Sequence, residues 1–570
     1  MSGTVEYRIQ AYEMLFDLYI LQMDIYCEGC IRKGCIRKEL RMGTYLNPGN
    51  KGFQAITNDI YVDKTGLIDY VNHTLYTPRR LTCISRPRRF GKSFAAKMIC
   101  AYYDRSCDSH SLFDGLAVSK SKLYETHLNQ YDVIYLDVTR FISLASDIKM
   151  VVQDIQDAVI RELRQAYPEY VREEEQNLAE ALVCISHAIQ NEFIIIIDEW
   201  DALFREAKND DLLQKEYIQL LRGLFKGGPA TDESIAAAYM TGILPIKKYG
   251  TESALTDFQE FTMTDPDELA PYVGFTESEV RELCKQYHAD FEDMKCWYDG
   301  YYFDNIGSVY SPNSVMSAIR RKSCRNYWTS SETYESLKNY ISMNLDGLGD
   351  AVISMLGGQR QKVEPLYFQN DLTSLTNKNH VLTLLVHLGY LAYHQKSKEV
   401  CIPNQEVADS FRLAVQDAGW EKIGAALMDA EDLLDATIRG DSHAVEKALE
   451  DIHMSKSSVL KYNDENSLAC AIYIAYYTAG RFYEIVRELP SGKGFADVVF
   501  IPRRNTDRPA MLVELKYEKT ADSAINQIQD NQYDGILRDY FGNLILVGIN
   551  YDKESRGKNA KRHTCVIKYV

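Results

Sequence analysis

Short apolar runs alternate with longer stretches of helical periodicity through the first half of the chain. Five of these runs are short enough to be strands, and amphipathic segments lie between them. The run that begins at Phe193 contains four successive isoleucines, which is typical of a parallel strand buried on both faces. This alternation predicts an α/β domain built on a parallel sheet. We expect one strand to begin at residue 81 and four more to cover 133–138, 193–199, 235–240 and 258–263. The expected helices cover 146–167 and 173–190.

The pattern changes twice beyond about residue 265. Thr276 and Glu279 form a capping box that opens a helix, and helical spacing continues to about 455 around a small hairpin near 400. From about 456, an apolar helix (467–479) precedes strands near 494–500 and 510–516 and a helix that contains Gln527. We therefore expect an N-terminal extension outside the folded core (1–41), an α/β domain (42–265), a mostly helical middle region (266–455) and a C-terminal α/β domain (456–570).

Composition narrows the functions that such a chain can have. It has 570 residues, of which 46% are hydrophobic and 25% charged, as expected for several globular domains. The formal net charge of -17 argues against binding nucleic acid by bulk electrostatics, so any nucleic-acid site must be a local basic patch. A basic group near the C-terminus offers either that patch or a solvated loop between two strands: Lys553, Arg556, Lys558, Lys561 and Arg562.

The distribution of apolar residues and cysteines bears on the compartment. No apolar segment is long enough to span a bilayer, and the N-terminus lacks a charged-then-apolar leader. The 13 cysteines are dispersed, as expected for reduced thiols. These features predict a cytoplasmic protein without membrane contact.

A basic loop follows the strand at 81 and carries the first cluster of candidate chemistry. Gly91, Lys92 and Ser93 open the next helix. Backbone N–H groups and the helix dipole can cradle phosphates there, the lysine can reach the outer phosphates, and the hydroxyl can complete a Mg²⁺ shell. Arg86 stands where the standard loop has its first glycine. The plain alternative is a helix capped by Ser93, with the arginines as solvated surface.

Two acidic residues at the end of a later strand could act together with this loop. Asp198 and Glu199 follow the four isoleucines, and the carboxyl ends of parallel strands form the ligand-binding edge of such sheets. We expect Asp198 to hold Mg²⁺ and Glu199 to polarise the attacking water. A further strand between the two motifs, together with this glutamate, is typical of P-loop folds with an added central strand.

The C-terminal domain carries a second cluster. Glu514 and Lys516 are two residues apart on one expected strand, so they face the same side. If Asp497 closes the neighbouring antiparallel strand, its carboxylate joins Glu514 around one Mg²⁺ or Mn²⁺ ion. Lys516 would then orient or deprotonate a water that attacks a phosphodiester, and Glu488 is a further candidate metal ligand. The plain alternative is an exposed strand face that alternates acid and base.

Several motifs together resemble the predicted AAA-ATPase family of bacterial proteins: Phe53, YVDKT at 61–65 and RPRRFGKS at 86–93. In that family, this domain is commonly joined to a PD-(D/E)XK nuclease-like domain, which the segments around Asp497 and 514–516, with the following Gln527 and Tyr533, also resemble. Some relatives carry arginine where this chain has Phe495.

The resemblance implies an AAA-like P-loop fold of the ASCE branch and a C-terminal restriction-endonuclease-like fold. It also implies that Arg86, Arg89 and Phe90 belong to the nucleotide-binding loop, and the family shares the arginine in place of the first glycine. Thr241 resembles the family's sensor position, which would monitor the γ-phosphate. Alternatively, Thr241 only begins a turn with Gly242.

The two clusters predict an ATP-binding and ATP-hydrolysing module that controls, or is coupled to, a Mg²⁺-dependent nuclease-like module acting on DNA or RNA. The alternative is a nucleotide-controlled switch whose C-terminal domain binds nucleic acid or a protein partner without cleaving, which the acidic net charge and Arg86 favour. Full ATP hydrolysis calls for an arginine finger. Arg86, Arg88 and Arg89 are candidates, and an oligomer would allow one of them to act on a neighbouring subunit.

Overall fold

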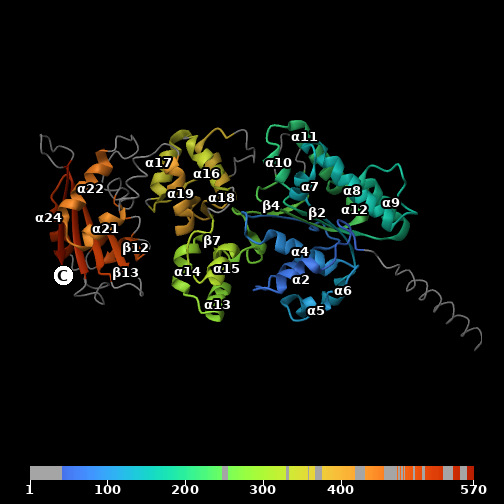
Figure 1. Cartoon of the computed structure of the whole chain (residues 1–570), viewed down its shortest axis with the longest axis horizontal. Coiled ribbons are helices and arrows are strands. Elements are labelled where there is room, and N and C mark those ends of the chain that lie inside the picture. The colour runs from blue at the N-terminus through green and yellow to red at the C-terminus, as the bar shows by residue number, and fades with distance from the viewer. Residues whose placement is uncertain are drawn as a thin grey trace, which may run out of the picture.

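The computed structural model describes most of the chain from residue 42 onward, and the expected extension at 1–41 lies outside the described residues. Figure 1 shows the N-terminal sheet with its helices at one end, the middle helices next to it and the C-terminal sheet at the other end. Within the described part, no helix is both long and apolar enough to cross a membrane. The described residues are 42–246, 255–328, 333–343, 345–356, 358–365, 375–417, 430–454, 472, 476, 479, 482–491, 494–502, 508–530, 544–552 and 562–570.

A five-stranded parallel sheet forms the centre of the N-terminal domain. Its strands are β1 (Leu81–Ser85), β2 (Asp132–Asp137), β3 (Phe193–Asp198), β4 (Ile235–Gly242) and β5 (Gln259–Phe261). Their spatial order is β2-β3-β4-β1-β5, and every neighbouring pair is parallel. Strand β4 lies between β1 and β3, so the sheet has the added central strand that we expected. The strand between the two motifs in sequence, β2, lies instead at the edge of the sheet.

The two faces of this sheet are covered by different helices. Ile194 and Ile196 of β3 pack with α4 (Lys92–Tyr103) and α3 (Gly66–Thr74), whereas Ile195 and Ile197 pack with the helices of the opposite face. The isoleucine run is therefore buried on both sides, as the sequence predicted. Figure 1 shows this layering. The other helices are α2 (Lys51–Thr57), α5 (His110–Phe113), α6 (Tyr124–His127), α7 (Val138–Leu144), α8 (Val151–Ala166), α9 (Leu178–Ile189), α10 (Ala202–Glu206), α11 (Asp211–Phe225) and α12 (Pro229–Ser234).

The helices expected at 146–167 and 173–190 both begin later than the sequence pattern indicated. Asp147 accepts a hydrogen bond from the Lys149 backbone N–H and starts a short 3-10 turn, and α8 follows that turn. Asn177 accepts hydrogen bonds from two backbone N–H groups and begins α9, so the acidic residues before it lie outside the helix. Apolar periodicity located both helices, but a polar cap sets the first residue of α9 and a capped 3-10 turn precedes α8.

The middle region combines helices with two small antiparallel sheets. The capping box of Thr276 and Glu279 is present and opens α13 (Glu277–Tyr287), as expected. Of the strands in these two sheets, only the hairpin of β10 (Ala392–His394) and β11 (Glu399–Cys401) was anticipated. The remaining elements are β6 (Phe275–Thr276), α14 (Phe291–Tyr298), β7 (Tyr301–Phe303), β8 (Gly307–Tyr310), α15 (Pro312–Arg321), α16 (Thr333–Ser342), α17 (Leu348–Leu356), β9 (Gln361–Lys362), α18 (Lys378–His387) and α19 (Gln405–Asp417).

A mixed sheet forms the C-terminal domain, with strands β12 (Tyr483–Ser491), β13 (Gly494–Pro502), β14 (Ala510–Tyr517), β15 (Leu544–Tyr551) and β16 (His563–Tyr569) in that spatial order. Only the β14–β15 pair is parallel. Helix α24 (Ala521–Asp530) packs on one face, and α21 (Ala430–Ile438) and α22 (Ser442–Met454) pack on the other. The core of this domain therefore includes helices that precede residue 455. Of the apolar helix expected at 467–479, only Ile472, Tyr476 and Ala479 are described, and they are buried in this core.

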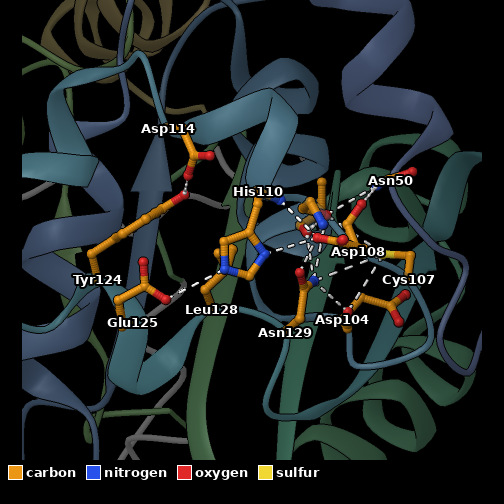
Figure 2. A network of polar contacts seen from close by, with 12 residues as sticks. Asn50, Asp104, Cys107, Asp108, His110, Asp114, Tyr124, Glu125, Leu128 and Asn129 are labelled. Carbon is orange, nitrogen blue, oxygen red and sulfur yellow. Dashed lines mark hydrogen bonds and ion pairs between the residues drawn. The ribbon is translucent and has the colours of Figure 1, made fainter.

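A polar network fixes the loop that follows α4, the helix of the phosphate loop. Figure 2 shows Asn129 among the side chains of this loop. Asn129 accepts from the Ser109 backbone N–H at 2.8 Å and donates to the carbonyl of Asp104 at 2.6 Å. Asn50 donates to the carbonyl of Asp108 at 2.8 Å, which ties α2 to the same loop. The C-terminal end of α4 is thereby held to α2 and to the start of β2.

We expect Asn129→Ala to lower the free energy of unfolding of this domain by about 2–3 kcal/mol. The change removes the hydrogen bonds to Ser109 and Asp104 and places alanine at a φ of 55°, which residues with a β-carbon rarely adopt. Denaturant-dependent hydrogen exchange of α4 would measure the loss. Asn129→Gly relieves the backbone strain without restoring the bonds, so it should recover only part of the stability. If Asn129→Ala left the free energy of unfolding unchanged, the network would have no structural role.

Candidate nucleotide and nuclease sites

The phosphate-loop residues lie where β1 meets α4. Gly91 has a φ of 94°, and a β-carbon there would have no atom within 4 Å, so the left-handed backbone rather than crowding favours glycine. Lys92 is the first residue of α4 and is buried. Its Nζ lies 3.1 Å from Glu199 Oε1 and donates to the Pro87 carbonyl at 3.1 Å. Ser93 follows at the half-buried N-terminus of the helix. The loop and the acidic strand end, 106 residues apart in sequence at Lys92 and Asp198, are thus brought together.

Asp198 is held by two hydroxyl groups at the carboxyl edge of the sheet. Thr241 Oγ1 donates to Asp198 Oδ1 at 2.5 Å, and Tyr135 Oη donates to Oδ2 at 3.1 Å. Thr241 also accepts from the Glu199 backbone N–H at 3.3 Å. The threonine therefore contacts both acidic residues, beyond any role in the turn at Gly242. Tyr135 comes from the edge strand β2, and no sequence motif pointed to it.

Glu199 is surrounded by positive charge. Its backbone has a φ of 53°, and its carboxylate contacts both Lys92 and Arg205, the latter at 2.6 Å. Burial acts to raise the pKa of Glu199, but the charges of Lys92, Arg205 and Arg88 outweigh it and lower that pKa below its ordinary value. Glu199 is therefore ionised at neutral pH, as a group that polarises water must be. Arg205 lay outside every motif that we identified.

Arg86 lies beneath the phosphate loop and is fully buried. It donates to the carbonyls of Ser85 and Phe261 at 3.0 Å each, and its guanidinium carbon lies 5.3 Å from the centre of the Phe303 ring. Burial lowers the pKa of Arg86 to about 10, which leaves it charged at neutral pH. Burial and the charge of Arg86 together lower the pKa of His387 to about 3. The geometry favours a role for Arg86 in supporting the loop rather than the nucleotide contact expected from the sequence.

The rest of the loop packs against the middle region. Arg89 Nη1 donates to the carbonyl of Tyr327 at 2.7 Å, and the Phe90 ring meets the Tyr301 ring edge to face, with centroids 5.3 Å apart. Pro87 lies against Gly389, where a β-carbon would approach its ring to 2.7 Å. The side chains of Arg89 and Phe90, which we expected at the nucleotide, are therefore directed to the middle region. A rearrangement of this loop would be transmitted to that region directly.

Glu406 of α19 lies behind this contact and was missed by the sequence analysis. It is buried and accepts from the Tyr327 backbone N–H at 2.6 Å, while Arg89 contacts the carbonyl of the same residue. Ser314 donates to its second oxygen at 2.8 Å. Burial raises the pKa of Glu406 from 4.5 to about 7, although these hydrogen bonds and the charge of Arg89 act against the shift.

We expect Glu406 to make the middle region less stable as the pH rises from about 5 to about 7. In that interval the folded chain keeps a proton on Glu406 that the unfolded chain has released, so folding weakens by up to about 3 kcal/mol. Glu406→Gln should remove this dependence while keeping the shape of the side chain. Thermal unfolding of both forms across this range tests it, and an identical pH slope in the two forms would contradict it.

The C-terminal cluster is assembled on β13 and β14. Asp497 lies one residue beyond the Val498–Val513 pair, and its Oδ2 accepts from the Leu515 backbone N–H at 2.7 Å. Lys516 Nζ donates to Glu514 Oε1 at 3.0 Å. Both Glu514 and Lys516 are buried, so the plain alternative of an exposed alternating face does not hold. The structure thus brings these three residues of two strands together.

The residues present fit a divalent cation. Glu514 Oε2 is buried and has no hydrogen-bond partner within the described residues, which leaves an oxygen ready for an ion. Burial and the neighbouring Asp497 raise the pKa of Glu514 to about 7, and a bound cation would favour its ionised form. Of the described residues, Asp497 and Glu514 would supply carboxylates here. Carboxylate oxygens suit Mg²⁺ or Mn²⁺, which keep several waters.

The supporting residues are only partly described. Gln527 of α24 donates to Glu514 Oε1, so the helix supports this carboxylate. Glu488 lies on β12, but its side chain, like that of Phe495, is outside the described residues. Tyr533 and residues 553–561 are also outside them, so the basic patch is represented only by Arg562, directly before β16.

The geometry defines two classes of domain. A parallel sheet of this order with a phosphate loop is that of a P-loop ATPase, and a mixed sheet with a D…E-x-K cluster is that of a nuclease-like domain. Residues 49–251 match the family model described as Predicted AAA-ATPase, and residues 463–561 match that of the PD-(D/E)XK nuclease superfamily. The chain therefore carries a predicted AAA-ATPase domain followed by a PD-(D/E)XK nuclease superfamily domain. The resemblance inferred from the motifs and the α/β fold class are confirmed.

Solved structures give weaker similarities. The Walker-type ATPase of Pyrococcus abyssi is 13% identical, with a TM-score of 0.31 over 61% of this chain and 94% of that chain. The ORC2 protein of Aeropyrum pernix, in its ADPNP–ADP complexes, is 12% identical, with a TM-score of 0.32 over 65% of this chain and 98% of that one. The Cdc6p protein of Pyrobaculum aerophilum is 10% identical, with a TM-score of 0.20 over 62% and 93%. A comparison with curated proteins gave no match.

Proposed function

We propose that the chain binds and hydrolyses ATP in its N-terminal domain and that the nucleotide controls a metal-dependent nuclease in its C-terminal domain. The observation that carries the first part is the convergence of Lys92, Asp198, Glu199 and Thr241 at the carboxyl edge of one parallel sheet. Lys92 would bind the outer phosphates, Thr241 would monitor the γ-phosphate, and Glu199 would orient the attacking water. Ser93 and Asp198 would hold Mg²⁺, which would neutralise phosphate charge.

The proposal for cleavage is supported by the cluster of the half-buried Asp497 with the buried Glu514 and Lys516. Asp497 and Glu514 would hold Mg²⁺ or Mn²⁺, which would stabilise the negative charge that develops on the phosphate oxygens. Lys516 would orient a water toward phosphorus, so that a new P–O bond forms while the bond to the leaving sugar oxygen breaks. The substrate class is nucleic acid, DNA or RNA.

The packing of the phosphate loop supports control by nucleotide. Arg89 and Phe90 join the loop to the middle region, which precedes the nuclease-like domain in the chain. Of the three candidate arginine fingers in the loop, Arg86 is enclosed and Arg89 contacts Tyr327, while the charge of Arg88 acts on Glu199 in the same site.

The test is a cleavage matrix of single- and double-stranded DNA and RNA with Mg²⁺, Mn²⁺ or chelator and with ATP, ADP, a non-hydrolysable ATP analogue or no nucleotide. We expect metal-dependent product whose rate changes with the nucleotide. If nucleic acid or a protein binds in a nucleotide-dependent way and no cleavage product forms under any condition, the result would favour a switch that binds its partner without cleaving. Cleavage that is indifferent to nucleotide would contradict the coupling alone.

A further inference from the structure

Arg205 occupies a fixed position beside the acidic strand end. It lies on α10, directly after β3, and its guanidinium donates to Glu199 Oε2 at 2.6 Å and to Asp201 Oδ2 at 3.1 Å. The side chain of Arg205 is only 12% exposed. Two charge-assisted hydrogen bonds from different nitrogens set both the place and the plane of the guanidinium.

Asp201 anchors this arginine to the sheet. The Asp201 carboxylate is buried and accepts from the backbone N–H groups of Ile243 at 3.2 Å and Leu244 at 3.0 Å, directly beyond β4. The Trp200 backbone N–H also donates to the Thr241 carbonyl at 2.8 Å. Arg205 is therefore supported by the same strand end that carries Thr241, and its position does not depend on Glu199 alone.

The Glu199 carboxylate is shared between two cations. Lys92 Nζ lies 3.1 Å from Oε1, and Arg205 Nη2 lies 2.6 Å from Oε2. Lys92 has to turn away from Glu199 to reach a phosphate, because its ammonium cannot hold both partners in the present geometry. A buried carboxylate left without a cation is strongly destabilising. Arg205 is the cation that keeps a hydrogen bond to Glu199 Oε2 when Lys92 leaves.

We propose that Arg205 is a positioning residue for ATP hydrolysis. It keeps hold of one Glu199 oxygen, so Lys92 can move from the other oxygen to the phosphates, and it then holds the freed carboxylate in place for the attacking water. This inference rests on the proposed ATPase function. It assigns Arg205 no contact with ATP.

The test is a double-mutant cycle between Arg205 and Glu199, with the dissociation constant of Mg²⁺-ATP measured by calorimetry and kcat by phosphate release. Arg205→Ala should weaken ATP binding about tenfold, because Lys92 then leaves Glu199 unpaired, and should lower kcat about tenfold or more. In a Glu199→Gln background the carboxylate charge is gone, so the same change should alter ATP affinity less than about twofold. A purely structural role would weaken binding equally in both backgrounds.

Two further variants complete the test. Arg205→Lys keeps a cation for Glu199 but not the fork to Asp201, so it should recover ATP affinity more than kcat, and it replaces the alanine variant if that does not fold. Lys208 is an exposed neighbour of Arg205, so Lys208→Ala should have the ATP affinity and kcat of the wild type. If wild type and Lys92→Ala bind ATP equally, the ATPase proposal falls and this inference falls with it. If wild type binds ATP but the Arg205 effect is the same in both backgrounds, only the role of Arg205 is overturned.

Discussion

Replacing Lys92 by alanine is expected to weaken the binding of Mg²⁺-ATP by about 100-fold or more. Lys92 is the first residue of α4, and its buried ammonium lies 3.1 Å from Glu199 Oε1 at the acidic strand end. The variant loses the charge that would bind the outer phosphates and leaves Glu199 with Arg205 as its remaining cation contact shown here. Both effects oppose a polyanionic ligand, because the Glu199 carboxylate then faces the phosphates with one cation contact fewer. Calorimetric titration with Mg²⁺-ATP measures the change.

Lys97 provides the matched control for this experiment. It lies on the same helix, and its side chain is exposed. Lys97→Ala removes the same charge from α4, so a general electrostatic effect on ATP would appear in both variants, whereas a phosphate contact would be lost only with Lys92. Equal affinities for wild type and the Lys92 variant would mean that the loop does not bind phosphate. Thermal unfolding of both variants checks that the fold is kept.

The N-terminal fold could be predicted because its signals are local. The isoleucines of β3 alternate between two helical layers, and any strand that is apolar at every position must be covered on both faces. The order of the strands in the sheet can be predicted only after the motifs have identified the class of fold. In the middle region, the only strands predicted from the sequence were those of the β10–β11 hairpin. The small sheets of this region have strands of two to four residues, such as Phe275–Thr276 and Gly307–Tyr310, which are too short to show a period.

Some residues of the candidate sites could likewise be predicted from local sequence signals, and others could not. Lys92, Asp198, Glu514 and Lys516 could be found because each sits next to a strand or helix end that the sequence marks. Arg205 and Glu406 could not, because their importance lies in partners that only the folded chain brings near. For Arg86, the sequence suggested a contact that the structure does not show. A basic residue in a phosphate loop suggests a ligand contact, but its guanidinium instead meets the carbonyls of Ser85 and Phe261 beneath the loop.

Replacing Lys516 by alanine is expected to reduce nucleic-acid cleavage by about 10²–10⁴-fold, the range typical of a group that positions or deprotonates the attacking water. Its ammonium lies 3.0 Å from Glu514 Oε1 and also donates to the Leu515 carbonyl at 2.9 Å, so the side chain is fixed toward the cluster. The metal ligands proposed here, Asp497 and Glu514, are retained in this variant. We therefore expect Mg²⁺ or Mn²⁺ still to raise its melting temperature, which would separate lost chemistry from lost metal binding.

Lys519→Ala is the control, because Lys519 follows the same strand with an exposed side chain. Asp497→Asn completes the comparison, since it should lose both cleavage and stabilisation by the metal. Cleavage at equal rates by wild type and the Lys516 variant would remove the nuclease assignment, whatever the nucleotide present. Loss of cleavage in the Lys519 variant as well would point to a phosphate-binding surface instead of a reacting group. Only loss confined to Lys516 and Asp497 places the reaction at the buried cluster, because these side chains meet there across β13 and β14.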